Sequence, residues 1–407
     1  MANVIKQPFD EGVIQSQEAE APRARRLLPL ALATMSSQGL LVVLTPIIVE
    51  VARDLGASVG AVGQARSTFA GAAIVSSLVI APLLDRLGVR LLLLWGAGFA
   101  IAGCAAVAAS PSLEVFGSVQ VLLGVGFACL MSAGFAGVAA FPVEDRPWAM
   151  GYLVGANGLA WVVVNPLAGV LTDLFSWRVA YTIPAMIALC VIAWARTAPG
   201  GNVTVASGVG LRGVLAKPSA RRWVLSEMIS LFAWGAYLTF TGAFFIERYG
   251  LSESATGVLL ALLAAAFFVV SVRVAPLLSH LPRSLLVAAS ALGMGAFIAL
   301  QLGVQAALWV VLAAAFSCAI AGGIRLTVSS TLGLSQLPDQ PGSIMAVRTA
   351  AIQMGYLLGG LVGGATLAWG GYAALGLLLG AATILSAALV LRVSDPLASR
   401  NQGFRIG

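Results

Sequence analysis

The chain has 407 residues, of which 59% are apolar and 10% are charged, and its mean hydropathy is +0.97. A soluble domain carries roughly 25% charged residues, so this composition excludes a water-soluble protein and predicts an all-α integral membrane protein. The net charge of +7 comes from scattered basic residues, which excludes a nucleic-acid-binding arm and leaves no nucleic acid as partner.

Apolar runs between charged or Pro/Gly breaks predict twelve transmembrane helices, because a span needs about 20 apolar residues. They cover residues 27–50, 61–83, 90–110, 113–139, 149–171, 178–196, 223–247, 254–278, 284–304, 306–333, 344–369 and 372–393.

The domain organisation follows from these runs. Residues 1–26 carry charges of both signs without the apolar core of a signal peptide, and are predicted to be a disordered cytoplasmic tail. Residues 27–196 form a first six-helix half, the Gly- and Ser-rich residues 197–222 a cytoplasmic linker, and residues 223–393 a second half. Residues 394–407 form a second cytoplasmic tail.

Basic residues predict the orientation of the spans. Of the 23, sixteen fall on the side of the two termini, against Arg53, Arg178 and Arg248 on the other side and four within spans. The positive-inside rule therefore predicts that both termini are cytoplasmic. The membrane expected is the plasma membrane, which is the inner membrane of a bacterium.

The two halves resemble each other in sequence. Arg25-Arg26 and Ala81-Pro82-Leu83-Leu84 recur as Arg221-Arg222 and Ala275-Pro276-Leu277-Leu278, at offsets of 196 and 194 residues. Two pseudo-symmetric halves with a substrate site between them are typical of a transporter.

The strongest local motif lies between spans two and three, where the chain reads Leu84-Asp85-Arg86-Leu87-Gly88-Val89-Arg90. A carboxylate and two guanidiniums on a short turn can hold neighbouring helix ends together. The motif resembles the loop signature of the major facilitator superfamily: Asp85, Arg86, Gly88 and Arg90 match, whereas Ala81 and Val89 depart from it. The resemblance implies that this loop is a cytoplasmic gate, to which Arg146, and Arg348 as a contact of Asp85, would belong.

Span five adds a second resemblance, to the Gly/Pro motif of the drug antiporter group within this superfamily. The residues of this motif, which imply close helix packing, are Gly155, Gly158, Asn165, Pro166 and Gly169. Asn165 and Ala168 depart from it, because each stands where the motif usually has Gly. Antiporters of this group usually have an Arg in span four where this chain has Gln120, so proton coupling by the usual route is in doubt.

Charged residues inside spans are functional candidates, because burying them in lipid is costly. Arg325 lies about 12 Å from the inner end of span ten and could face substrate or form a structural ion pair. Glu227 could pair with Arg325 or Arg348, carry a coupling proton, or lie at the cytoplasmic interface. Arg66 and Arg273 are interpreted mainly as interfacial anchors. Arg66 has the alternative of an outer gate.

The residues predicted to line the substrate cavity are Gln38, Gln120, Glu227, Trp234, Tyr237 and Arg325. His280 has no partner spaced for ligation and no phosphate-binding loop occurs, so we expect no enzyme, catalytic residue, metal or cofactor.

The prediction is therefore a monomeric secondary transporter that moves a small organic molecule by alternating access, with efflux of an amphiphilic compound preferred. An organic-anion carrier, favoured by the excess of arginines within spans, and a non-transporting ligand sensor are the alternatives.

Overall fold

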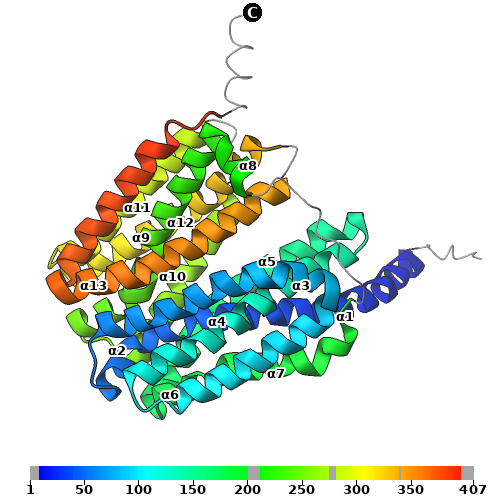
Figure 1. Cartoon of the computed structure of the whole chain (residues 1–407), viewed down its shortest axis with the longest axis horizontal. Helices are drawn as coiled ribbons and strands as arrows, with labels where there is room; N and C mark the ends of the chain where they lie inside the picture. Colours follow the sequence, from blue (N-terminus) through cyan, green and yellow to red (C-terminus); the bar gives the residue numbers. More distant parts are fainter. Residues whose placement is uncertain (1–8, 200–210, 275–280, 339–340, 396–407) are drawn as a thin grey trace, which may run out of the picture.

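The computed structural model describes residues 9–199, 211–274, 281–338 and 341–395 (Figure 1). Throughout these ranges the chain forms helices and their connections, without a β-strand. The α-helices are α1 Phe9–Val42, α2 Leu44–Asp54, α3 Val59–Ala108, α4 Leu113–Ala136, α5 Arg146–Leu174, α6 Trp177–Ala180, α7 Thr182–Trp194, α8 Leu211–Ala216, α9 Pro218–Tyr249, α10 Glu253–Arg273, α11 Arg283–Gly303, α12 Leu308–Gln336 and α13 Pro341–Val390. Short 3₁₀ turns at Gly137–Ala140, Val143–Asp145 and Ala195–Thr197 complete the described structure.

Within the described ranges, nine helices are long and apolar enough to cross a membrane, or ten if the bent pair α1 and α2 counts as one span. Helices α3 and α13 have 50 residues each, or about 75 Å at 1.5 Å per residue, more than twice the thickness of a bilayer core. Each is interrupted once, at Gly88 (φ 75°) and at Gly371 (φ 66°). Only glycine adopts this backbone region readily, so these two residues set the turns within α3 and α13.

Two helix boundaries differ from the sequence prediction. Helix α1 begins at Phe9, so the residues predicted to be a disordered tail are helical from there on; Glu, Ala, Gln and Arg, which favour helix, dominate this stretch. In the predicted linker, α8 and the first turn of α9 follow residues 200–210, which lie outside the described residues. Hydropathy does not reveal these helical segments, because each is too short or too polar to be a span.

The helices form two groups, α1 to α7 in the lower part of Figure 1 and α8 to α13 in the upper part. The groups meet at the left of this view and diverge at the right. Helices α1 and α2 meet at a bend of 41°. Pro46 has no N–H to donate to the carbonyl of Val42 four residues earlier, which accounts for a break at this place.

Glycines bring the two groups into contact at the end where the groups meet, which we call the closed side. A Cβ on Gly60 of α3 would meet Gly364 of α13, and one on Gly242 of α9 would meet the backbone at Thr45 of α2. The amide of Gln64 donates to the carbonyl of Leu361 across the same interface (3.4 Å). Backbones this close leave no passage between α3 and α13 at this end.

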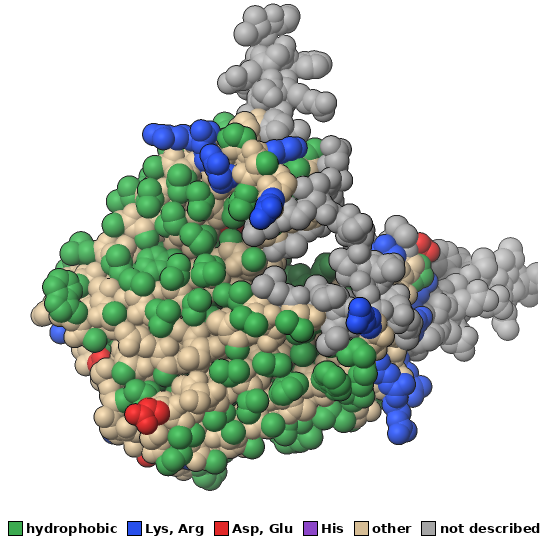
Figure 2. Space-filling model, viewed as in Figure 1, with side chains coloured by type: hydrophobic (Ala, Val, Ile, Leu, Met, Phe, Trp, Pro, Cys, Tyr) green, Lys and Arg blue, Asp and Glu red, His purple; other side chains and the backbone are tan. Residues whose placement is uncertain are grey.

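On the opposite side the molecule is hollowed between the two groups (Figure 2). Most basic side chains visible in Figure 2 lie at the ends that flank this hollow, whereas acidic ones gather at the closed end. The described basic residues that are exposed at the helix ends on this side include Arg23, Arg25, Arg26, Arg86, Arg90, Arg146, Arg196, Arg212, Lys217, Arg221, Arg222, Arg273 and Arg392.

Candidate functional site: a cavity between the two helix groups

A cavity of about 500 Å³ lies between the two groups of helices. Its described wall comes from α1, α2 and α5 of the first group and from α9, α10, α11, α12 and α13 of the second. This volume suits a small organic molecule, since ligand pockets span roughly 300–1,000 Å³.

Aromatic rings form one wall of the cavity. Trp234 stacks on Phe267, with ring centroids 5.6 Å apart and planes 25° apart, and also contacts Tyr237 at 5.6 Å. Trp161, on the facing group, donates from its indole N–H to Oε1 of Gln38 at 3.1 Å. Aromatic faces on both sides of the gap can hold a flat ring between them.

Polar groups that face the cavity have unused hydrogen-bonding capacity. Asn165 donates to the carbonyl of Trp161 at 2.7 Å, and its Oδ1 has no partner among the described residues. The same holds for Oδ1 of Asn157 and Oγ of Ser230. Buried polar atoms are almost always paired, so these three unpaired atoms are hydrogen-bonding capacity that remains in residues of the cavity wall.

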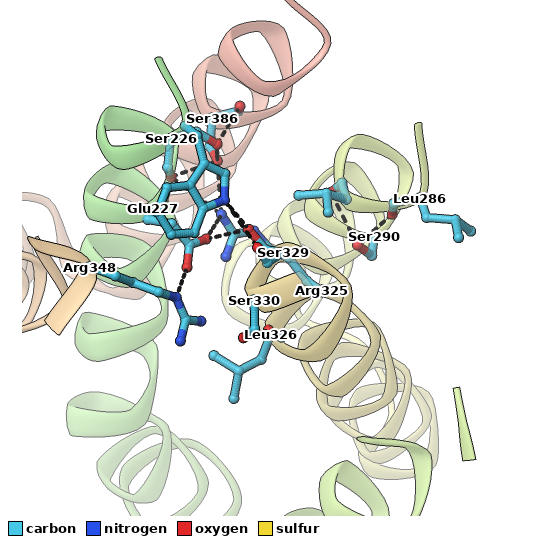
Figure 3. A network of polar contacts seen from close by, with 12 residues as sticks. Ser226, Glu227, Leu286, Ser290, Arg325, Leu326, Ser329, Ser330, Arg348 and Ser386 are labelled. Atoms are coloured by element: carbon cyan, nitrogen blue, oxygen red, sulfur yellow. Dashed lines mark hydrogen bonds and ion pairs between the residues drawn. The ribbon is translucent and has the colours of Figure 1, made fainter. Parts of the chain in front are cut away.

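An ion cluster of Glu227, Arg325 and Arg348 lies at the wall of the cavity (Figure 3). Glu227 of α9 accepts from Nε of Arg348 at 2.7 Å, from Nη2 of Arg325 at 3.0 Å, and from the hydroxyl of Ser329 at 2.9 Å. Glu227 is fully buried, and the side chains of Arg325 and Arg348 are 3% and 13% exposed. The predicted pairing of Glu227 with an arginine is therefore confirmed, and it involves both candidates.

Further hydrogen bonds hold this cluster in place. The indole of Trp223 donates to both the carbonyl and the hydroxyl of Ser329, at 3.1 and 3.0 Å. Arg325 also donates to the carbonyl of Ser226 at 3.3 Å and to the hydroxyl of Ser386 at 3.4 Å. Helices α9 and α12 and both arms of α13 are thereby joined around one carboxylate.

Of the residues predicted to line the cavity, four do so: Gln38, Trp234, Tyr237 and Arg325. Gln120 and Glu227 do not line this cavity, nor a second cavity of about 30 Å³ that adjoins it at Trp161, Leu238 and Tyr356, and this part of the prediction is wrong. Gln120 is buried on α4 beside Tyr181, within the first group. Glu227 lies behind the wall because a carboxylate is more stable against two guanidiniums than in an apolar cavity.

The predicted gate residues lie at the open side. Arg86 and Arg90 are exposed on either side of the turn at Gly88. Arg146 donates to the carbonyls of Phe141 and Ala139, at 3.1 and 2.9 Å, and so caps the turn that precedes it.

The contact predicted between Asp85 and Arg348 stays a prediction. The side chain of Asp85 lies outside the described residues, as does His280, and in this conformation Arg348 binds Glu227.

The span-five motif packs across the two groups, against α10. A Cβ on Gly158 would meet Phe268, one on Gly169 would meet the backbone of Glu253, and the backbone at Asn165 and Pro166 lies against Gly257. Gly155 has open space where a Cβ would be, so its predicted packing role is wrong for this conformation. Gly155 is exposed, so no neighbouring helix packs on α5 at this position.

Other wall residues carry little or no signal in the sequence. Phe267 and Phe268 on α10, and Ser330 and Tyr356 on α12 and α13, all line the cavity. The two phenylalanines lie in an uninterrupted apolar run and carry no signal. Tyr356, a polar ring in a glycine-rich span, could have been singled out.

The comparisons with known proteins agree with this architecture. The profile of the Major Facilitator Superfamily matches residues 30–340, and the chain belongs to this family. Members of this family are transporters, so the chain is a multi-pass membrane protein and not an enzyme.

Individual relatives are more distant. The chain is 33% identical over 226 residues to the transcription regulatory protein OpdE of Pseudomonas aeruginosa, of whose length it spans about half (53%; 52% of this chain). It is 26% identical over 333 residues to the purine ribonucleoside efflux pump NepI of Salmonella paratyphi A, covering 78% of this chain and 81% of NepI. Among solved structures, a D-xylose-proton symporter superposes with a TM-score of 0.76 at 15% identity, over 91% of this chain and 98% of that one.

Proposed function

We propose that this protein is a monomeric secondary transporter that exports a small amphiphilic compound, carrying an aromatic ring, by alternating access. The observation that carries the proposal is the cavity of about 500 Å³ between the two helix groups, closed at one end and open at the other. The cavity is complete within one chain, so one copy suffices.

The proposal includes twelve spans in two pseudo-symmetric halves. The bent pair α1 and α2 counts as one span, as do α6 and α7, and the breaks at Gly88 and Gly371 divide α3 and α13 into two spans each. Each half then has six.

The open side faces the cytoplasm in this proposal. Exposed arginines and lysines concentrate at the helix ends around the hollow, on the side of the linker and of both described chain ends, and basic residues favour the cytoplasmic side. In a bacterial inner membrane the cavity is then open to compounds from inside the cell, as an exporter requires.

The cavity wall supports an amphiphilic substrate. Trp161 and Trp234 offer ring faces, while Asn157, Asn165 and Ser230 offer unpaired polar atoms. A purine ribonucleoside, the kind of compound after which the relative NepI is named, combines a flat base with a polar sugar and is a suitable neutral probe of the cavity wall.

We further propose how the two states exchange. When the open side closes, Arg348 leaves Glu227 and binds Asp85 in the loop signature, joining the two halves. Glu227, released from one arginine, is then the candidate carrier of a coupling proton.

Counterflow in proteoliposomes tests the transport proposal. Vesicles loaded with an unlabelled compound that binds the purified protein should accumulate the same labelled compound, and protein-free vesicles should not. Binding without exchange for every compound tested would refute transport.

Binding without exchange would instead support a ligand sensor on a transporter fold. The name of the relative OpdE, a transcription regulatory protein, is the one observation that favours this second function.

A further inference from the structure

The charged residues that the described walls of the internal cavities contain are arginines. Arg325 and Arg348 line the large cavity, and Arg66 lines a second cavity of about 30 Å³ on its closed side. Among the described wall residues of both cavities there is no carboxylate, because Glu227 is fully buried behind them.

The ion cluster leaves one positive charge uncompensated. Arg325 and Arg348 share the single carboxylate of Glu227. Nε of Arg325 and Nη2 of Arg348 are buried and have no hydrogen-bond partner among the described residues. A buried N–H of a cation without an acceptor is costly, so an anionic group drawn to these two wall residues would supply an acceptor that the described residues do not.

Arg66 is a second uncompensated cation. Its Nη2 donates to the carbonyl of Leu41, beside the bend between α1 and α2, while its Nη1 is buried without a partner among the described residues. Within the described part of the chain no carboxylate lies within ion-pair distance of Arg66. The adjoining cavity of about 30 Å³ holds one water molecule or one carboxylate oxygen.

The two cavities follow each other along one path. Trp161, Leu238 and Tyr356 line both of them and therefore form the partition between them. Small residues surround the second cavity on the side of Arg66, including Gly63, Gly235 and Gly360. A molecule that moved from the large cavity toward the closed side would pass the three partition side chains and reach Arg66.

We propose that the exported compound carries an acidic group, which binds Arg325 and Arg348 in the open cavity and is transferred to Arg66 as the closed side opens. This inference rests on the proposed export function and names its substrate class: an aromatic carboxylate or phosphate rather than a neutral or cationic amphiphile. A carboxylate accepts two hydrogen bonds from a guanidinium, and Arg is the side chain best suited to it. The aromatic body would remain against Trp161 and Trp234.

The first experiment measures the sign of the potential in the cavity and needs no known substrate. Ser230→Cys, in a variant without the four native cysteines, places a thiol in the wall of the large cavity. The measured quantity is the rate of reaction with the anionic sulfonatoethyl methanethiosulfonate divided by the rate with the cationic trimethylammonioethyl reagent. We expect this ratio to be higher for the thiol in the cavity than for the thiol of glutathione. Arg348→Gln should lower this ratio, and Arg248→Gln, an exposed arginine that lines neither cavity, should not. A ratio equal to that of glutathione, or one that Arg348→Gln leaves unchanged, overturns the inference.

The second experiment compares matched acids and amides, such as indole-3-acetate and indole-3-acetamide, as ligands and in exchange. Loss of one charged hydrogen bond weakens binding by about tenfold or more. We therefore expect Arg348→Gln to raise the Kd of the acid by about that factor and to leave the amide nearly unchanged. Arg66→Gln should raise the KM for acid added to the face of the protein that is closed in this structure more than the KM for acid added to its open face.

The outcomes separate this inference from the function on which it rests. Exchange of amides as readily as acids, with equal losses for both in Arg348→Gln, refutes the acidic substrate and leaves transport standing. Selective binding of acids without exchange supports the anion site and refutes transport.

Discussion

Glu227 is the residue whose loss we expect to destabilise the second helix group most. Glu227→Gln removes the single negative charge that Arg325 and Arg348 share, at 3.0 and 2.7 Å. The amide Oε1 can still accept one hydrogen bond, but its NH₂ group would face Nε of Arg348, donor against donor.

The magnitude follows from burial. Breaking a buried ion pair by removing one partner costs about 3–5 kcal/mol, and here the side chains are 0%, 3% and 13% exposed. The second substitution in Glu227→Gln/Arg325→Gln removes the more deeply buried of the two unpaired cations. Arg348, at the cavity wall, can then be hydrated. The double variant should therefore be more stable than Glu227→Gln alone.

Thermal unfolding in detergent can be followed with a thiol-reactive fluorophore, because Cys104, Cys129 and Cys318 are buried until the protein unfolds. Glu247→Gln is the matched control, since Glu247 is an exposed carboxylate on the same helix that binds only the hydroxyl of Tyr372 among the described contacts. The reasoning is wrong if Glu227→Gln melts together with the Glu247→Gln control, or if the double variant is less stable than the single one.

Three further predictions concern the gates and the cavity. Asp85→Asn should increase labelling of a cysteine at position 230 by a membrane-impermeant reagent added on the side of the termini, because the closed form of that side loses its proposed contact with Arg348; equal labelling would contradict this. Gly169→Val should disturb the closed side, because its side chain would meet the backbone of Glu253, and should increase labelling of the same cysteine by reagent added on the face opposite the termini. Gly155→Val is the control: a side chain there has open space, so labelling should not change. Trp234→Ala should weaken binding of an aromatic ligand by about two- to tenfold. Trp309→Ala is the control, because Trp309 is 73% exposed, and it should leave binding unchanged. A similar loss of affinity in both variants would argue against the aromatic wall.

Some of the site is predictable from the sequence and some is not, and Glu227 shows the division. A charged residue in an apolar run is visible in the sequence, and the cost of burying it already predicts a partner of opposite charge. The pairing with Arg348 joins residues 121 positions apart, and only the packing of α9 against α13 decides that this arginine, together with Arg325, is the partner.

Gln120, Gly155 and Arg66 show the same limit. The sequence offers only the residue type and its distance from a span end, whereas the direction of a side chain depends on which neighbouring helices surround it. Gln120 faces other helices of the first group, and Gly155 faces open space. Arg66, interpreted mainly as an interfacial anchor, instead lines a cavity on the path between the halves.

The amino-acid sequence alone is enough to identify a helical membrane protein, to locate most of its helices, and to find the loop that carries the family signature. Hydropathy and turn residues are local properties, and a bilayer forces the backbone of each span to satisfy its own hydrogen bonds. Which side chains face the cavity emerges only when the helices are packed together, because burial and charge pairing are properties of several helices at once. The same holds for the finding that the charged side chains of the described cavity wall are arginines.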